Sequence, residues 1–387
     1  MVMEACPTQL LHLKEILNAF ASSTGLRVNY NKSVMVPLNI SEETLQNLAT
    51  TFQCQKGSLP FTYLGLPLGT TKPNIEDFVP LMQKVEKRLQ CTSMFLSQGG
   101  KLEMVNSVFS SSAVFHAGTL KLHKGVINQL DKYWKHCLWR GGDLGSKKPH
   151  KAAWSMVTLP KKQGGLGVQR TATHNDAMLM KFLHKFFNKV NVPWVKLIWD
   201  NYYHNGTLPG QQNKGSFWWK DIVKLLDTYK GLAAPIINDG STVWFWKDLW
   251  HGVIPAQDYP HLFSFVKDPN ITFSHVAALH DITECFHLPL SSQAFEQLES
   301  LKQTMHGIVL RQDKDIWSYI WNNQIYSTAK AYKVMIGTRM IHPAFKWIWT
   351  SKCQMKHKVF FLAPTQGQAE HKRHPKKEEY AIGLLYL

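Results

Sequence analysis

The string Phe61-Thr62-Tyr63-Leu64-Gly65-Leu66-Pro67-Leu68-Gly69 separates two kinds of sequence in this chain of 387 residues. Short apolar runs flank its centre, and glycine accepts the left-handed backbone that a tight turn requires. The string therefore predicts a β hairpin around Gly65. From Ile75 onward, apolar residues recur mostly at helical spacing. We expect an α+β protein that is mostly α.

The residues before the hairpin predict two helices and two strands. Residues 8–23 and 41–52 carry apolar side chains at helical spacing, and Ser41 stands where an N-cap hydroxyl is expected. Residues 26–30 alternate apolar and polar side chains, which favours a strand. Residues 34–36 follow a predicted turn and are expected to form the returning strand.

The residues after the hairpin predict a helical bundle and then a tryptophan-rich region that is partly irregular. Short hairpins are expected at 240–250 and within 313–361. The polar, charged tail at 364–379 is predicted to be poorly ordered. The expected helices lie at 78–89, 102–109, 126–138, 171–200, 217–226, 291–305 and 329–336.

The composition indicates a polyanionic partner. The net charge is +17 and the sequence pI is about 9.5, and nucleic acid is the usual partner of so basic a chain. The six cysteines form no CxxC pair, which fits a reducing compartment. We predict an intracellular protein, with the nucleus left open. No signal peptide and no apolar run of membrane-spanning length is recognised.

A second string, Gly25-Leu26-Arg27-Val28-Asn29-Tyr30-Asn31-Lys32-Ser33, matches the pattern GLxINxxKS except at Val28. Followed by the FxYLGLPLG hairpin, it resembles the palm end of plant non-LTR (LINE-type) retrotransposon reverse transcriptases. The resemblance extends over roughly residues 3–361. It implies a partial palm at 1–74, a thumb at 75–170, a connector at 171–312, the start of a reverse-transcriptase zinc-binding domain at 313–361 and a divergent tail at 362–387.

The resemblance also implies roles for individual residues. Lys32 falls on the lysine that approaches the incoming triphosphate, where a cation neutralises charge on the leaving pyrophosphate. The hairpin falls on the primer grip, which presses on the primer backbone. The primer-grip positions are Tyr63, Leu64, Gly65 and Gly69. Without the two motifs, Lys32 would be interpreted as an ordinary lysine in a surface turn. The hairpin around Gly65 would be interpreted as part of a hydrophobic core.

Further strings resemble later parts of the family. Residues 96–101 resemble LSxGGR and residues 131–141 resemble xFLWxG, both in the thumb. Residues 164–168 match GGLGv, residues 239–250 resemble GxxxxFWxDxW, and residues 326–361 resemble the start of the zinc-binding domain.

Residues 121–170 hold eleven Lys or Arg but only two acidic residues, Asp131 and Asp143. A surface of this kind tracks phosphates without reading sequence, so RNA and DNA are the expected partners. Interleaved aromatics could stack on bases, although Trp134 and Trp139 are predicted to be buried. The candidate nucleic-acid-binding residues are Lys121, Lys124, Lys132, Lys135, Arg140, Lys147, Lys148, Lys151, Lys161 and Lys162.

Members of this family are RNA-directed DNA polymerases, which use two metal ions held by a pair of aspartates. The first aspartate here is Asp77, so we expect the catalytic centre to be cut off and the chain alone to be inactive. No cofactor is expected on this fragment, although the intact family uses Mg²⁺. Asp313 and Asp315 form a close pair, which we predict to lie in a solvated loop.

Other chemistry finds little support. No GxSxG, GxxxxGK[ST] or HExxH motif is present, and no small-molecule substrate is evident. Cys353, His357, His371 and His374 have a spacing that zinc could use, but we expect it to be accidental.

Three interpretations stay open. The chain is a catalytically dead fragment of a reverse transcriptase, a repurposed basic nucleic-acid-binding protein, or a non-functional pseudogene product. A frame encoding a YADD-like turn directly upstream of Met1 would favour the first.

Overall fold

The computed structural model describes residues 2–92, 96–140, 152–203, 206–210, 214–338, 343–354 and 357–358. The chain divides into two compact units, Met1–Val79 and Pro80–Leu387. Helices dominate, and the named strands of the described residues form three two-stranded sheets. The prediction of an α+β protein that is mostly α is confirmed.

The first unit is built on two packed helices, α1 (Pro7–Thr24) and α2 (Glu42–Phe52). Leu10 of α1 and Leu45 and Leu48 of α2 are buried where the helices meet. The predicted cap of α2 is confirmed, because the Ser41 hydroxyl accepts a hydrogen bond from the Thr44 amide at 3.2 Å.

The predicted strand at 26–30 is wrong. The side chain of Asn29 accepts a hydrogen bond from the Lys32 amide at 3.1 Å and closes the 3₁₀ turn η1 (Tyr30–Lys32). The strand β1 (Val34–Met35) exists, but it pairs in parallel with β2 (Gln55–Lys56). Alternating polarity was therefore overridden by a local side-chain bond to the backbone.

The predicted hairpin is confirmed. Strand β3 (Phe61–Tyr63) pairs antiparallel with β4 (Leu66–Leu68), with Tyr63 opposite Leu66. The 3₁₀ turn η2 (Glu76–Phe78) then leads out of the unit.

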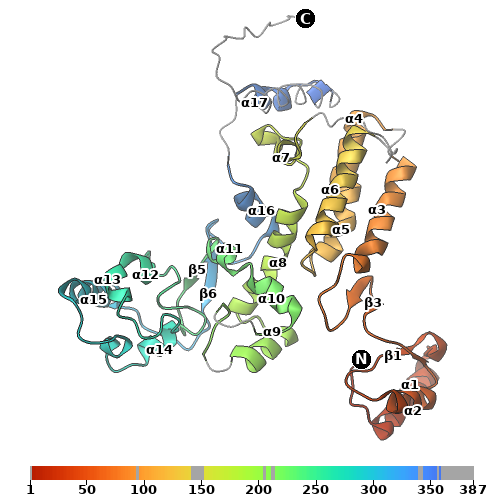
Figure 1. Cartoon of the computed structure of the whole chain (residues 1–387), viewed down its shortest axis with the longest axis horizontal. Coiled ribbons are helices and arrows are strands. Elements are labelled where there is room, and N and C mark those ends of the chain that lie inside the picture. The colour runs from red at the N-terminus through yellow and green to blue at the C-terminus, as the bar shows by residue number, and fades with distance from the viewer. Residues whose placement is uncertain are drawn as a thin grey trace, which may run out of the picture. The chain divides into compact units, whose positions relative to one another are not determined.

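The predicted bundle forms the first part of the second unit, where α3 (Val79–Thr92), α5 (Ser110–Ala117) and α6 (Lys124–Trp139) lie side by side (Figure 1). The expected helix at 102–109 is longer and comprises α4 (Gln98–Met104), the π turn η3 (Val105–Phe109) and α5. Val85 and Leu89 of α3 and Val126 and Leu130 of α6 are fully buried. The Tyr133 hydroxyl of α6 donates a hydrogen bond to Glu86 of α3 at 3.2 Å.

The predicted helix at 171–200 is interrupted. Helix α8 (Thr171–Phe187) ends before Lys189, whose backbone is left-handed with φ of 43°. Helix α9 (Pro193–Ile198) and the π turn η5 (Trp199–Tyr203) follow, since a proline starts a helix readily but does not continue one.

An aromatic core surrounds α8. Phe186 and Phe187 are fully buried, and the ring of Phe186 stacks on Trp199 with centroids 4.4 Å apart. Leu183, Trp317 and Ala331 belong to the same core, so residues on both sides of the predicted border at 312/313 pack together. The other elements packed around this core are α10 (Phe217–Val223), α11 (Leu226–Lys230), β5 (Ala233–Ile236), β6 (Ile316–Tyr319) and α16 (Thr328–Ile336).

Strands β5 and β6 form one antiparallel sheet, with Ala233 opposite Tyr319 and Ile236 opposite Ile316 (Figure 1). Strand β6 takes its partner strand from about eighty residues earlier, and the hairpin expected within 313–361 is reduced to an isolated antiparallel bridge between Tyr319 and Asn323.

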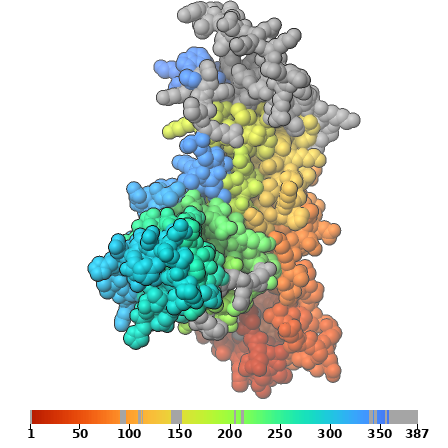
Figure 2. Space-filling view, turned by 60° about the vertical axis from the view of Figure 1, so that its left-hand side comes forward, coloured from red at the N-terminus to blue at the C-terminus, as the bar shows by residue number. Residues whose placement is uncertain are grey.

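The segment between β5 and β6 has a core of its own. Trp246, Trp250, Phe273 and Leu301 are buried together, and the segment forms the turquoise to cyan lobe of Figure 2. The hairpin expected at 240–250 is wrong, since Trp244 bridges Thr272 instead. The helical elements of this lobe are α12 (Pro255–Asp258), α13 (Pro260–Phe263), α14 (Phe273–Ala277), the 3₁₀ turn η6 (Ile282–Cys285) and α15 (Ser292–Met305).

The prediction that Asp315 lies in a solvated loop is wrong. Its side chain is 1% exposed. Its Oδ1 accepts hydrogen bonds from the amides of Asn238 and Gly240, both at 2.8 Å. Its Oδ2 accepts from the amide and the hydroxyl of Thr242, both at 2.9 Å. One carboxylate therefore orders the loop that leaves β5, whereas Asp313 is exposed as expected.

The predicted tail at 362–387 and two of the possible zinc ligands, His371 and His374, lie outside the described residues. Helix α17 (Pro343–Thr350) is the last named element. In the described ranges no helix combines the length and apolar character needed to cross a membrane.

Candidate nucleic-acid interface

The hairpin of the first unit presents its turn to solvent. Leu64 and Gly65 have φ of 50° and 83°, the left-handed pair of a type I′ turn. Leu64 is 75% exposed and Tyr63 is 59% exposed. A Cβ on Gly69 would lie 3.2 Å from the Pro60 side chain, so a larger residue there would crowd Pro60. An exposed aromatic and an exposed leucine on a tight turn can press on a flat or extended partner.

Lys32 is also exposed in the first unit. It is the last residue of η1, and its amide is held by Asn29. The turn fixes the backbone of Lys32 and leaves its ammonium group in solvent.

The second unit carries the predicted basic residues. Lys124 and Lys132 on α6, and Lys161 and Lys162 on the 3₁₀ turn η4 (Lys161–Gln163), are exposed. Lys147, Lys148 and Lys151 fall outside the described residues.

The remaining predicted basic residues have partners within the protein. Lys121 forms an ion pair with Asp176 of α8. The ammonium of Lys135 lies 5.3 Å from the ring centre of Trp154, and Arg140 contacts the His136 ring. Lys121 thus ties the loop before α6 to α8, Lys135 of α6 contacts Trp154, and the contact of Arg140 stays within the end of α6.

Asp131 anchors the basic surface. Its carboxylate accepts a hydrogen bond from the Trp154 indole at 3.0 Å and another from the Thr171 hydroxyl at 2.8 Å. It thereby joins α6 to α7 (Trp154–Val157) and to the start of α8. Burial raises the pKa of Asp131 above its usual value, against the hydrogen bonds from Thr171 and Trp154, which favour the carboxylate. From the sequence, Asp131 is visible only as one of two acidic residues among eleven basic ones, which gives no sign of its structural role.

The loop after α7 holds Lys161 and Lys162 in place. A Cβ on Gly165 would lie 2.1 Å from the carbonyl oxygen of Leu159, so only glycine fits there. Gly167 has φ of 74° and packs under the side chain of Lys161, whose ammonium lies 5.2 Å from the ring centre of Trp349. The glycine-rich string thus builds a fixed support for two cations.

The aromatic residues of α6 do not face solvent. Tyr133, Trp134 and Trp139 are 6%, 3% and 8% exposed, which confirms the predicted burial of the two tryptophans. Trp154 is half-buried and is covered by Lys135. The rings of Tyr133, Trp134 and Trp139 therefore offer almost no exposed face, and the exposed groups of this surface are mainly lysine side chains.

No protein family profile matches this chain. It is similar to a protein of Arabidopsis thaliana named "Putative ribonuclease H protein At1g65750", with 30% identity over 192 residues. The match covers 48% of this chain and 31% of the Arabidopsis protein. This chain therefore corresponds to about a third of the length of that relative.

Proposed function

We propose that this chain is a part of a non-LTR retrotransposon reverse-transcriptase protein and that it binds RNA and DNA through phosphate contacts. The observation that carries the proposal is the set of exposed lysines on α6 and η4, fixed in position by Asp131 and the loop at Gly165. The two palm-end strings, in family order, support the ancestry. A relative named for ribonuclease H, an enzyme that acts on nucleic acid, supports the same class of partner.

The proposed activity of this chain is binding. Polymerisation requires carboxylates that clamp two metal ions, and residues 1–76 contain glutamates but no aspartate. The residues of the first unit do not fit such a metal pair, so we derive no catalytic step. The exposed hairpin around Gly65 is proposed as a second contact with a nucleic-acid backbone.

Fluorescence anisotropy with a 20-nucleotide single strand, titrated at several salt concentrations, tests the proposal. The wild type should lose affinity steeply as salt rises, because each phosphate contact releases counterions. Replacing Lys124, Lys132 and Lys162 by Gln should lower the slope of log affinity against log salt by about 2, at roughly 0.7 for each contact on a single strand.

A matched control removes three charges from the lobe between β5 and β6. Lys247, Lys267 and Lys302 replaced by Gln should leave the slope within about 0.5 of the wild type, since one contact is worth roughly 0.7. If the control lowers the slope as much as the α6 and η4 variant, binding follows net charge alone and the proposed interface is refuted. A second strand of different base sequence should bind equally well.

A further inference from the structure

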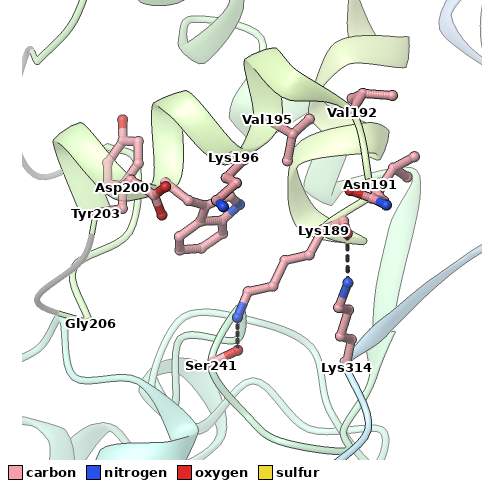
Figure 3. A pocket seen from close by; sticks show the side chains of 12 residues that line it. Lys189, Asn191, Val192, Val195, Lys196, Asp200, Tyr203, Gly206, Ser241 and Lys314 are labelled. Atoms are coloured by element: carbon pink, nitrogen blue, oxygen red, sulfur yellow. Dashed lines mark hydrogen bonds between the residues drawn. The ribbon is translucent and has the colours of Figure 1, made fainter.

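A pocket of about 420 Å³ lies between the end of α8, the α9–η5 segment and the loops that carry Ser241 and Lys314 (Figure 3). Val195 and Tyr203, both buried, are part of its lining. Three lysines line it, Lys189, Lys196 and Lys314, against one carboxylate, Asp200. The residues that line the pocket come from separate segments of the chain, so their spacing in the sequence does not reveal it.

Lys189 occupies a backbone position that favours glycine. It ends α8 in a Schellman arrangement, in which the Val190 amide donates to the Lys185 carbonyl and the Lys189 amide donates to the Phe186 carbonyl, both at 3.0 Å. Lys189 is the left-handed residue of this motif, with φ of 43°. Glycine is the common residue there, and any other residue is strained. A lysine at this disfavoured backbone position points to a use for its side chain.

The side chain of Lys189 is held in the pocket before any ligand binds. Its ammonium donates to the Ser241 hydroxyl at 2.6 Å and lies 3.7 Å from the Asp239 carboxylate. It also lies 4.9 Å from the ring centre of Trp199. A fixed cation binds an anion at a smaller cost in side-chain entropy than a mobile one.

Lys314 brings a second ammonium to the same place. It donates to the backbone carbonyl of Lys189 at 3.0 Å (Figure 3). An ammonium has three N–H donors, so further donors remain for a ligand. Lys196, exposed on α9, contributes the third positive charge of the lining.

The pocket is not built to stack a base. One face of the Trp199 ring lies against Phe186, with an interplanar angle of 3°, and Lys189 lies over the same ring. Tyr203 is buried. The charged groups around the pocket are three lysines against the carboxylates of Asp200 and Asp239, so positive charge predominates and favours a phosphate. A terminal phosphate carries close to two negative charges, about −1.5 to −2 near neutral pH, and therefore gains more from these ammonium groups than an internal phosphate does.

We infer that this pocket binds a terminal phosphate, a phosphate monoester such as the 5′ end of a nucleic-acid strand. The inference rests on the proposed function, in which the lysines of α6 and η4 bind the body of the strand. The pocket adds recognition of the phosphate at the strand's end. Because no ring reads the base, the recognition is independent of sequence.

The test compares a 12-nucleotide oligothymidylate carrying a 5′ phosphate with the same strand carrying a 5′ hydroxyl, by fluorescence anisotropy at one ionic strength. The wild type should bind the phosphorylated strand about tenfold more tightly, in line with the strength of charge-assisted hydrogen bonds. The preference should disappear in Lys189→Gly and in Lys196→Gln/Lys314→Gln, with affinity for the hydroxyl strand retained. Lys189→Gly relieves the left-handed backbone but loses the contacts with Ser241 and Asp239, so its thermal unfolding midpoint should stay close to that of the wild type.

The variant with Lys124, Lys132 and Lys162 replaced by Gln separates the two proposals. This variant should bind both strands more weakly, while the ratio of its affinities for the phosphorylated and hydroxyl strands stays that of the wild type. A change in overall affinity that leaves this ratio intact therefore concerns the proposed function and not the pocket. Excess thymidine 5′-monophosphate carries the same phosphate monoester and should remove the preference for the phosphorylated strand. A preference that persists under this competition would count against a phosphate pocket. Equal wild-type affinity for the two strands, or a preference that survives in both pocket variants, overturns the inference.

Discussion

Replacing Asp315 by Asn should destabilise the second unit by about 2 kcal/mol. The amide oxygen of Asn can keep the bonds from Asn238 and Gly240, but its NH₂ group then faces the Thr242 amide. Thr242 is fully buried, so water cannot replace the lost acceptor. A buried donor left without a partner costs roughly 1–3 kcal/mol, and the Thr242 hydroxyl can turn to accept from the new NH₂ group.

Urea unfolding followed by tryptophan fluorescence measures this effect, since Trp317 is fully buried two residues from the substitution. Asp313→Asn is the matched control, because it makes the same chemical change on an exposed side chain. The control should stay within about 0.5 kcal/mol of the wild type. If Asp315→Asn has the same unfolding midpoint as the control, the carboxylate does not hold the loop.

Three further outcomes are expected. Burial lowers the pKa of His184, so the unfolded state binds more protons than the folded state as pH falls through about 6.5. The free energy of unfolding should therefore be smaller at pH 5 than at pH 7, and this difference should shrink in His184→Gln. Gly165→Ala should destabilise by at least about 2 kcal/mol, since its Cβ would meet the Leu159 carbonyl, whereas Gly231→Ala, with ordinary contacts at 3.5 Å, should unfold like the wild type. The chain should extend no primer on an RNA template with Mg²⁺ or Mn²⁺, and template-dependent product above a mock preparation would contradict the proposed loss of the metal site.

Local signals predicted the helices well. Ser41 caps α2 as expected, and the apolar spacing predicted α1, α6 and α15 within about two residues, the usual disagreement at helix ends. The hairpin around Gly65 was also predictable, because its turn chemistry lies within the string itself. These features depend on neighbours in sequence.

Long-range features could not be predicted. The partners of Asp315 lie 73 to 77 residues away, and three of its four donors are backbone amides, which no residue type reveals. The partner strand of β6 is equally distant. In the candidate interface, the excess of lysine and arginine over acidic residues was visible in the sequence. The role of Asp131 was not, because it depends on α6, α7 and α8 meeting at its carboxylate.

The pairing of Ile236 with Ile316 has a consequence for how this chain can change in evolution. The chain leaves β5 and returns to β6 at neighbouring positions, so residues 237–315 form a large insertion whose two ends meet at one narrow neck. Lengthening or shortening such an insertion alters the entropy of closing it only slowly, about 0.6 kcal/mol for each doubling. Insertions and deletions should therefore accumulate in this lobe, while the sheet at its neck keeps its register.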